Sequence, residues 1–129
     1  MILAVDLGKK TTGLAISSGT IAAPYKTITH KNLNEAIAKI SKICNEESVD
    51  QLVLGFVEGK IKSYFDDFAK KFKDANPNIT VIPRDETLTS RQATETMINL
   101  GVPKLKRRQR EHEIAASHIL QGYLDELND

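Results

Sequence analysis

The chain has 129 residues, 40% of them hydrophobic and 27% charged, and its formal net charge is +1. This length and balance predict one ordinary globular domain. The net charge is too small to identify a polyanionic or membrane partner, so any electrostatic signal must be local. Cys44 is the only cysteine, so no internal disulfide can form, which is typical of a reducing compartment. The N-terminus lacks the layout of a signal peptide and no apolar run is long enough to span a bilayer, so we expect a cytoplasmic protein without a membrane partner.

The first part of the chain predicts three consecutive strands joined by tight turns. Residues 2–7 are apolar on both faces, which is typical of a central strand. Residues 13–18 and 20–28 follow after short turns and extend this strand into an antiparallel meander.

Beyond residue 30 the hydrophobic period changes, and helices alternate with strands. Asn32 and Glu35 form a capping box before a helical stripe, so a helix is expected over 33–47. The remaining expected elements are, in order, a strand over 50–56, a helix carrying Ile61, Phe65, Phe68 and Phe72, a strand over 79–83, a helix from Thr89 to Leu100, a basic loop over 104–110, and a last helix opened by Arg110–Glu113. This order predicts a single α/β domain over 1–129, with a mixed sheet flanked by helices.

Asp6 is unusual because it lies inside an apolar strand, where an unpaired carboxylate is costly. The alternation of the strand places it on the face of Ile2 and Ala4, and Gly8 and Gly13 let backbone approach whatever binds there. Asp6 could serve a ligand site, or it could only cap the following turn through backbone amides.

Two other places carry residues suited to chemistry. Asp85 and Glu86 follow a predicted strand and precede a capped helix, the position where ligands gather in α/β sheets. His112 lies four residues before Ala116, so it shares the sheet-facing side of the last helix and could face the strand ends. The simpler alternatives are that Asp85 and Glu86 only begin a turn and that His112 is a half-buried histidine with a backbone partner. Glu111 and Glu113 flank His112, and their simplest role is to complement the dipole of a helix that starts there.

The stretch KLKRRQR is the strongest local charge in the sequence. It is dense enough to contact nucleic-acid phosphates without base readout, and a solvated loop is the alternative. The expected nucleic-acid contacts are Lys9, Lys10, Lys104, Lys106, Arg107, Arg108 and Arg110.

Taken together, these features resemble the YqgF/RuvX family of Holliday-junction-resolvase-like proteins. The matching stretches are AVDLGKKTTGLAIS, LVLGF, DETLTS and EIAASHILQGYLD. The resemblance implies a ribonuclease H-like fold whose five-stranded mixed sheet has three antiparallel meander strands followed by parallel strands. It also implies a nuclease that trims the 5′ end of precursor 16S ribosomal RNA, with branched DNA as an older proposal for the substrate.

The resemblance also implies a metal-dependent site. Asp6, Glu86 and His112 are then the catalytic residues, and these three with Asp85 hold Mg²⁺ or Mn²⁺, with Asp6 and Glu86 expected on adjacent strands. The sequence departs from the family where His112 replaces an aspartate and Thr87 replaces an arginine. A non-catalytic nucleic-acid-binding module is therefore the main alternative, and a nucleotide-binding domain of the actin-like class ranks last because it needs two large lobes. As a free protein we expect a monomer or a weak homodimer.

Overall fold

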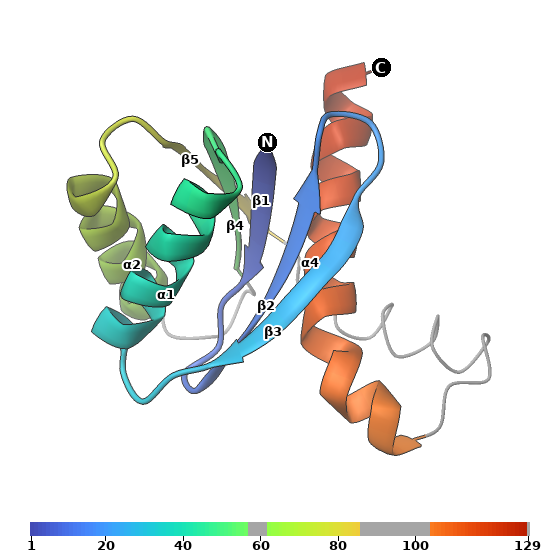
Figure 1. The fold of residues 1–129 in the computed structure, drawn as a ribbon, viewed down its shortest axis with the longest axis horizontal. Coiled ribbons are helices and arrows are strands. Elements are labelled where there is room, and N and C mark those ends of the chain that lie inside the picture. The colour runs from blue at the N-terminus through green and yellow to red at the C-terminus, as the bar shows by residue number, and fades with distance from the viewer. Residues whose placement is uncertain (57–61, 86–103, 129) are drawn as a thin grey trace.

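A five-stranded mixed sheet separates two layers of helices (Figure 1). The structure, a computed structural model, describes residues 1–56, 62–85 and 104–128, with the backbone alone described for residues 56 and 104–109. The strands are β1 (Ile2–Asp6), β2 (Thr11–Ser17), β3 (Ala23–Thr29), β4 (Gln51–Phe56) and β5 (Thr80–Asp85), and the helices are α1 (Leu33–Glu46), α2 (Lys62–Ala75) and α4 (Lys104–Asn128). Helices α1 and α2 lie on one side of the sheet and α4 on the other.

The sheet has the order β3-β2-β1-β4-β5, so β1 is its central strand. β1, β2 and β3 form an antiparallel meander, and β4 and β5 run parallel to β1. These pairings confirm the predicted mixed sheet. The expectation that Asp6 and Glu86 follow adjacent strands is wrong, because β4 lies between β1, which carries Asp6, and β5, which precedes Glu86. Glu86 itself lies outside the described residues.

The side of the sheet that faces α1 and α2 holds the larger core. Phe65, Phe68 and Phe72 recur along α2 and are buried, as their helical spacing predicted. The rings of Phe68 and Phe72 stack with centroids 5.6 Å apart. Cys44 is buried in the same core, and burial raises the pKa of its thiol to about 11, so it serves as a core residue. At the start of α1, Asn32 Oδ1 accepts a hydrogen bond from the Glu35 amide at 2.8 Å, as the capping box predicts.

The other side of the sheet is lined by small residues, and α4 packs against it. Ala4 and Ala15 from the sheet and Ala116 from the helix are fully buried there. Small side chains on both surfaces let the helix axis approach the sheet closely.

Helix α4 begins at Lys104, so the basic stretch 104–110 is its first two turns and the predicted loop is wrong. Lys, Leu, Arg and Gln all favour helix, and no glycine or proline interrupts the stretch. Glu111 and Glu113 consequently lie inside the helix, and their predicted interaction with the dipole at its start is wrong as well. Neither α4 nor any other helix in the described ranges combines the length and apolar character that a membrane crossing requires.

A buried polar pair closes the end of the sheet where β3 turns into α1. His30 is 4% exposed, and its Nε2 lies 2.8 Å from the hydroxyl of buried Thr12. Burial lowers the pKa of His30 below its ordinary value; Lys39 acts in the same direction and Glu35 opposes it. The neutral imidazole is therefore the form that the fold holds.

We expect His30 to make the fold acid-sensitive. Above about pH 6.5, the ordinary histidine pKa, His30 is neutral in both states and adds no pH dependence. Below that pH the unfolded chain takes up a proton that the folded protein resists, so stability falls as pH drops toward the lowered folded pKa. Thermal unfolding followed by circular dichroism between pH 7.5 and pH 5 should show a steeper loss for the natural protein than for His30→Gln. His118→Gln, a change at a partly exposed histidine, is the control, and equal slopes for all three proteins would contradict the prediction.

Candidate active site

Asp6 lies at the centre of one row of residues that crosses the whole sheet on the α4 side. The register pairs Asp6 with Gly13 of β2 and Gly55 of β4, and the row continues to Thr27 of β3 and Arg84 of β5. Two glycines therefore flank the carboxylate. They leave a lane free of side chains on each side of Asp6, into which the helix above can settle.

Helix α4 makes its closest approach to the sheet at Gly13. A Cβ atom on Gly13 would lie 2.0 Å from the carbonyl oxygen of His112 and 2.6 Å from the amide nitrogen of Glu113. On the other flank, a Cβ on Gly55 would lie 2.3 Å from the Ile119 side chain. Only glycine permits this packing, which fixes the height of His112 above Asp6.

The two side chains meet where the helix crosses β1. His112 Nδ1 lies 3.3 Å from Asp6 Oδ2, within reach of a hydrogen bond. The Asp6 side chain is 13% exposed and the His112 side chain is 39% exposed, so the carboxylate is shielded and the imidazole borders solvent. This pairing confirms the placement that counting back from Ala116 predicted, and it joins residues 106 positions apart.

Helix α2 supports the turn that follows Asp6. Tyr64 donates a hydrogen bond from its hydroxyl to the Gly8 carbonyl at 2.9 Å. Gly8 packs so tightly that a Cβ on it would lie 2.2 Å from the Thr11 carbonyl oxygen. The Gly8 amide in turn donates to the Thr12 hydroxyl at 3.4 Å. The carboxylate thus stands on a braced turn, which favours a positioned functional group.

Sequence reasoning missed a second polar cluster beside His112. The Glu113 carboxylate accepts a hydrogen bond from the Thr27 hydroxyl at 3.3 Å and one from Arg110 Nε at 2.8 Å. These contacts tie α4 to the edge strand β3. The only signal in the sequence was the spacing of Arg110 and Glu113, which brings their side chains together on a helix.

Arg84, at the far end of the row, ties α4 to the opposite edge. Its guanidinium crosses Gly122 and forms an ion pair of 2.8 Å with Glu126. Glu113 and Arg84 therefore anchor the helix on both sides of the Asp6–His112 pair.

The donor atoms at the pair fit a divalent cation in kind. A carboxylate with an imidazole suits Mn²⁺, whereas Mg²⁺ prefers oxygen ligands alone. Over the ranges that the structure describes, no three His, Cys, Asp or Glu side chains gather closely enough to hold an ion. Asp85 is the exposed last residue of β5 and follows Arg84, which contacts α4. Asp6 and His112 are thus two donor groups of a kind that divalent cations accept.

The other residues predicted for the site are distributed around it. Lys9 and Lys10 are exposed in the turn after Asp6, at the same end of the sheet. Arg110 is about half exposed and pairs with Glu113. Glu86 lies outside the described residues, and of Lys104, Lys106, Arg107 and Arg108 only the backbone, in the first turns of α4, is described.

The fold and the central-strand acid define the class first. A fowlpox virus Holliday junction resolvase shares this architecture with a TM-score of 0.62 at 19% identity, covering 97% of this chain and 98% of that one. Thermus thermophilus RuvC superposes with a TM-score of 0.60 at 8% identity, covering 98% and 96%. These likenesses establish a ribonuclease H-like fold of the resolvase type, as the sequence predicted.

Sequence comparison then gives the family. The model of the family described as "RuvX: Holliday junction resolvase" matches residues 1–126, so the chain belongs to the RuvX family. A Clostridium tetani protein with the name "Putative pre-16S rRNA nuclease" is 36% identical over 138 aligned positions. The alignment covers 98% of this chain and 96% of the relative. A protein of the same name from Aster yellows witches'-broom phytoplasma is 37% identical, covering 95% and 87%.

We expect Gly13→Ala to disturb the pair that it supports. The new methyl group meets helix backbone, which cannot rotate away, so overpacking should destabilise the protein by about 1–3 kcal/mol. Gly122→Ala is the matched control, since its methyl group would meet the end of the Arg84 side chain at 2.9 Å rather than helix backbone; displacing Arg84 costs at most its anchor to Glu126, and alanine gains about 1 kcal/mol of helix propensity. Urea unfolding measures both variants. Equal stability for the two would show that α4 does not need its close approach at Gly13.

Proposed function

We propose that this protein is a metal-dependent nuclease that acts on structured nucleic acid, and that its substrate is the 5′ region of precursor 16S ribosomal RNA. The observation that carries the proposal is the shielded Asp6 carboxylate facing His112 in a chain of the RuvX family. The names of the C. tetani and phytoplasma relatives support the RNA substrate. Such a substrate is consistent with a cytoplasmic location.

Each residue of the proposed site has its own role. Asp6 is the principal anionic ligand, His112 supplies a neutral nitrogen lone pair, and Glu86 is the further acid that the family resemblance implies. A divalent cation bound by these residues would activate water and stabilise the leaving oxygen of a phosphodiester. The braced turn at Gly8 and the anchors of α4 keep the two described ligands facing each other.

A second candidate function is a nucleic-acid-binding module with weak or absent catalysis. The observation that favours it is His112 itself, which contacts Asp6 but adds no negative charge when neutral. Two divalent ions carry four positive charges, whereas Asp6, Asp85 and Glu86 offer at most three negative ones. Branched DNA is the alternative ligand, because the fowlpox and Thermus proteins have been solved with Holliday junction DNA.

We expect His112→Asp to strengthen metal binding and cleavage. A second carboxylate beside Asp6 increases the negative charge that faces the cation, so Mn²⁺ affinity should rise about tenfold or more, equivalent to about 1.4 kcal/mol. Isothermal titration measures the affinity, and a 5′-labelled precursor 16S rRNA fragment reports cleavage. If neither quantity changes, His112 is not a ligand.

Asp6→Asn should abolish both metal binding and cleavage while leaving the fold intact. Asp50→Asn is the matched control, because Asp50 lies before β4 at the other end of the sheet and pairs with the N-terminal amine at 3.6 Å. Full cleavage by Asp6→Asn would overturn the proposed site. A protein that binds the RNA but does not cleave it, even with His112→Asp, would be the binding module.

The first turns of α4 should contribute phosphate contacts. Replacing Lys106, Arg107 and Arg108 with glutamine should weaken RNA binding regardless of sequence and flatten the salt dependence by roughly one unit of slope per lost contact. Fluorescence anisotropy at several salt concentrations measures the slope. An unchanged slope would mean that these residues only solubilise the helix.

A further inference from the structure

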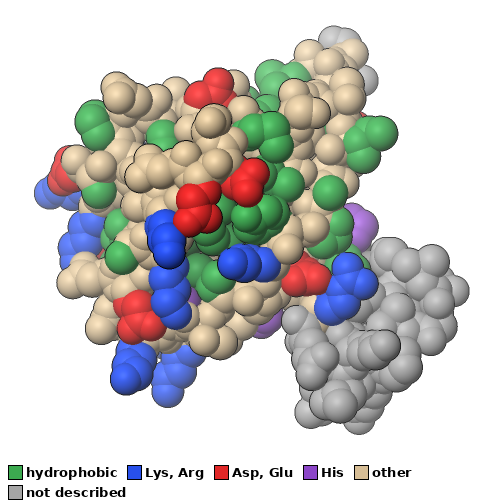
Figure 2. Space-filling view, in the orientation of Figure 1, with side chains coloured by type: hydrophobic (Ala, Val, Ile, Leu, Met, Phe, Trp, Pro, Cys, Tyr) green, Lys and Arg blue, Asp and Glu red, His purple; other side chains and the backbone are tan. Residues whose placement is uncertain are grey.

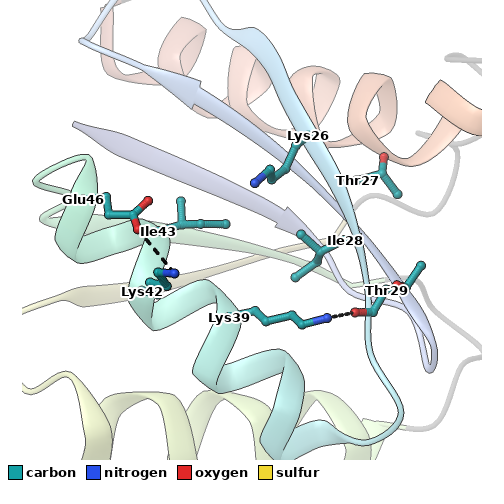
Figure 3. A pocket seen from close by; sticks show the side chains of 8 residues that line it. All are labelled: Lys26, Thr27, Ile28, Thr29, Lys39, Lys42, Ile43 and Glu46. Carbon is teal, nitrogen blue, oxygen red and sulfur yellow. Dashed lines mark hydrogen bonds and ion pairs between the residues drawn. The ribbon is translucent and has the colours of Figure 1, made fainter.

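A groove of about 350 Å³ runs between the edge strand β3 and helix α1, apart from the Asp6–His112 pair (Figure 3). Ile28 and Ile43 form its apolar floor, and its rim carries Lys26 from β3 and Lys42 from α1. Lys39 closes one end, where its ammonium donates a hydrogen bond to the Thr29 carbonyl. The groove is thus formed by two elements and has a basic rim.

An irregularity in β3 lies next to the groove. The register between β2 and β3 shifts between Leu14 and Ala15, so that Tyr25 is the extra residue of a β-bulge. Tyr25 reaches α1, where its hydroxyl donates to Glu47 at 3.1 Å, and Lys26 also points to the α1 side. Thr27 points to the opposite side, toward α4. The bulge therefore places Tyr25 on the same side of the sheet as its neighbour Lys26, which reaches that side by the ordinary alternation with Thr27.

The charge of the groove is positive. Three lysines and one glutamate line it, which leaves two net positive charges. Lys26 makes no ion pair with the described residues and has the Tyr25 ring as its neighbour, 5.9 Å from the ring centroid. Lys42 is 78% exposed and its contact with Glu46 is long, at 3.9 Å. Figure 2 shows both Lys or Arg and Asp or Glu side chains around the hydrophobic surface on this face. Both ammonium groups are available to an anion.

The groove lies within reach of a nucleic acid bound at Asp6. Asp6 pairs with Gly13 and Gly13 pairs with Thr27, the neighbour of Lys26. Two strand spacings, about 10 Å within the sheet, separate Asp6 from Thr27, and Lys26 lies on the opposite side of the sheet. At about 3.4 Å per nucleotide along a helical strand, the part of the path within the sheet corresponds to roughly three nucleotides, and the strand must then turn round the β3 edge. A substrate placed at the pair can thus continue over the β3 edge.

We propose that the β3–α1 groove is a second nucleic-acid contact that binds the phosphate backbone flanking the reaction site, with Lys26 and Lys42 as its principal cations. This inference rests on the proposed function, since it assumes a nucleic acid at Asp6. The groove offers charge without a base-reading element, so it should hold structured RNA irrespective of sequence. Lys39 lines the groove but is not one of its principal anion-binding cations, because its ammonium already contacts the Thr29 carbonyl and Glu35, the latter at 3.2 Å.

The test is a double variant, Lys26→Gln with Lys42→Gln, which removes the two charges and keeps the side-chain length. Its binding to a fluorescein-labelled RNA hairpin with a 5′ single-stranded extension is measured by anisotropy between 50 and 200 mM NaCl. We expect the salt slope to become shallower by about 1.5 units and affinity at 50 mM NaCl to fall roughly tenfold. Lys70→Gln with Lys71→Gln, at two exposed lysines of α2, is the matched control and should behave like the natural protein.

A second measurement uses the natural protein alone. Acetylation of surface lysines, read by mass spectrometry, should be slowed at Lys26 and Lys42 by the hairpin and unchanged at Lys70. Equal slopes for the groove variant and the control, or no protection, would overturn the groove. If Asp6→Asn then still abolishes cleavage, the nuclease proposal survives without it. Conversely, a reduced slope in a protein that never cleaves would support the groove and reject the nuclease.

Discussion

The close approach of helix α4 to the sheet at Gly13 is the constraint on which the candidate site depends. The carbonyl group of His112 occupies the space where any residue other than glycine at position 13 would place its Cβ. The imidazole of His112 can reach the carboxylate of Asp6 only because the helix lies this low. Small residues on this side of the sheet and polar anchors at both edges keep it there, through Glu113 at β3 and Arg84 at β5.

The two sides of the sheet have different tasks, and their compositions reflect this. The side under α1 and α2 is built from large apolar residues such as Phe68 and Leu52, whose burial supplies most of the hydrophobic stabilisation. The side under α4 gives up side-chain volume so that a carboxylate and a helix can meet. A shielded carboxylate costs free energy unless a partner offsets it, and His112 is the described group that does so for Asp6.

Local patterns in the sequence were sufficient for the strands, for α1 and for the meeting of Asp6 with His112, because each depends on a short-range period or on counting along one helix. The start of α4 does not follow from charge, because a dense run of basic residues is typical of a solvated loop, whereas the same residues also favour helix. The separation of β1 from β5 could not be predicted, since no local pattern specifies which strand inserts between them. The groove could not be predicted for a related reason: Lys26 and Lys42 lie on different elements and come together only where α1 packs beside β3.

The edge strand β3 links the two surfaces that matter for a polyanionic ligand. Its successive residues Lys26 and Thr27 point to opposite sides, one into the basic groove and the other to Glu113 beside His112. Carboxylates repel phosphate, so a site built around Asp6 cannot attract a nucleic acid by its own charge. Exposed cations such as Lys9 and Lys10 can attract it at this end of the sheet, and the proposed groove adds Lys26 and Lys42 on the side away from the carboxylates. In the proposed arrangement, the sheet and the edge strand β3 separate the anionic group that would hold a cation from the lysines that would hold phosphate, two strand spacings or about 10 Å apart within the sheet.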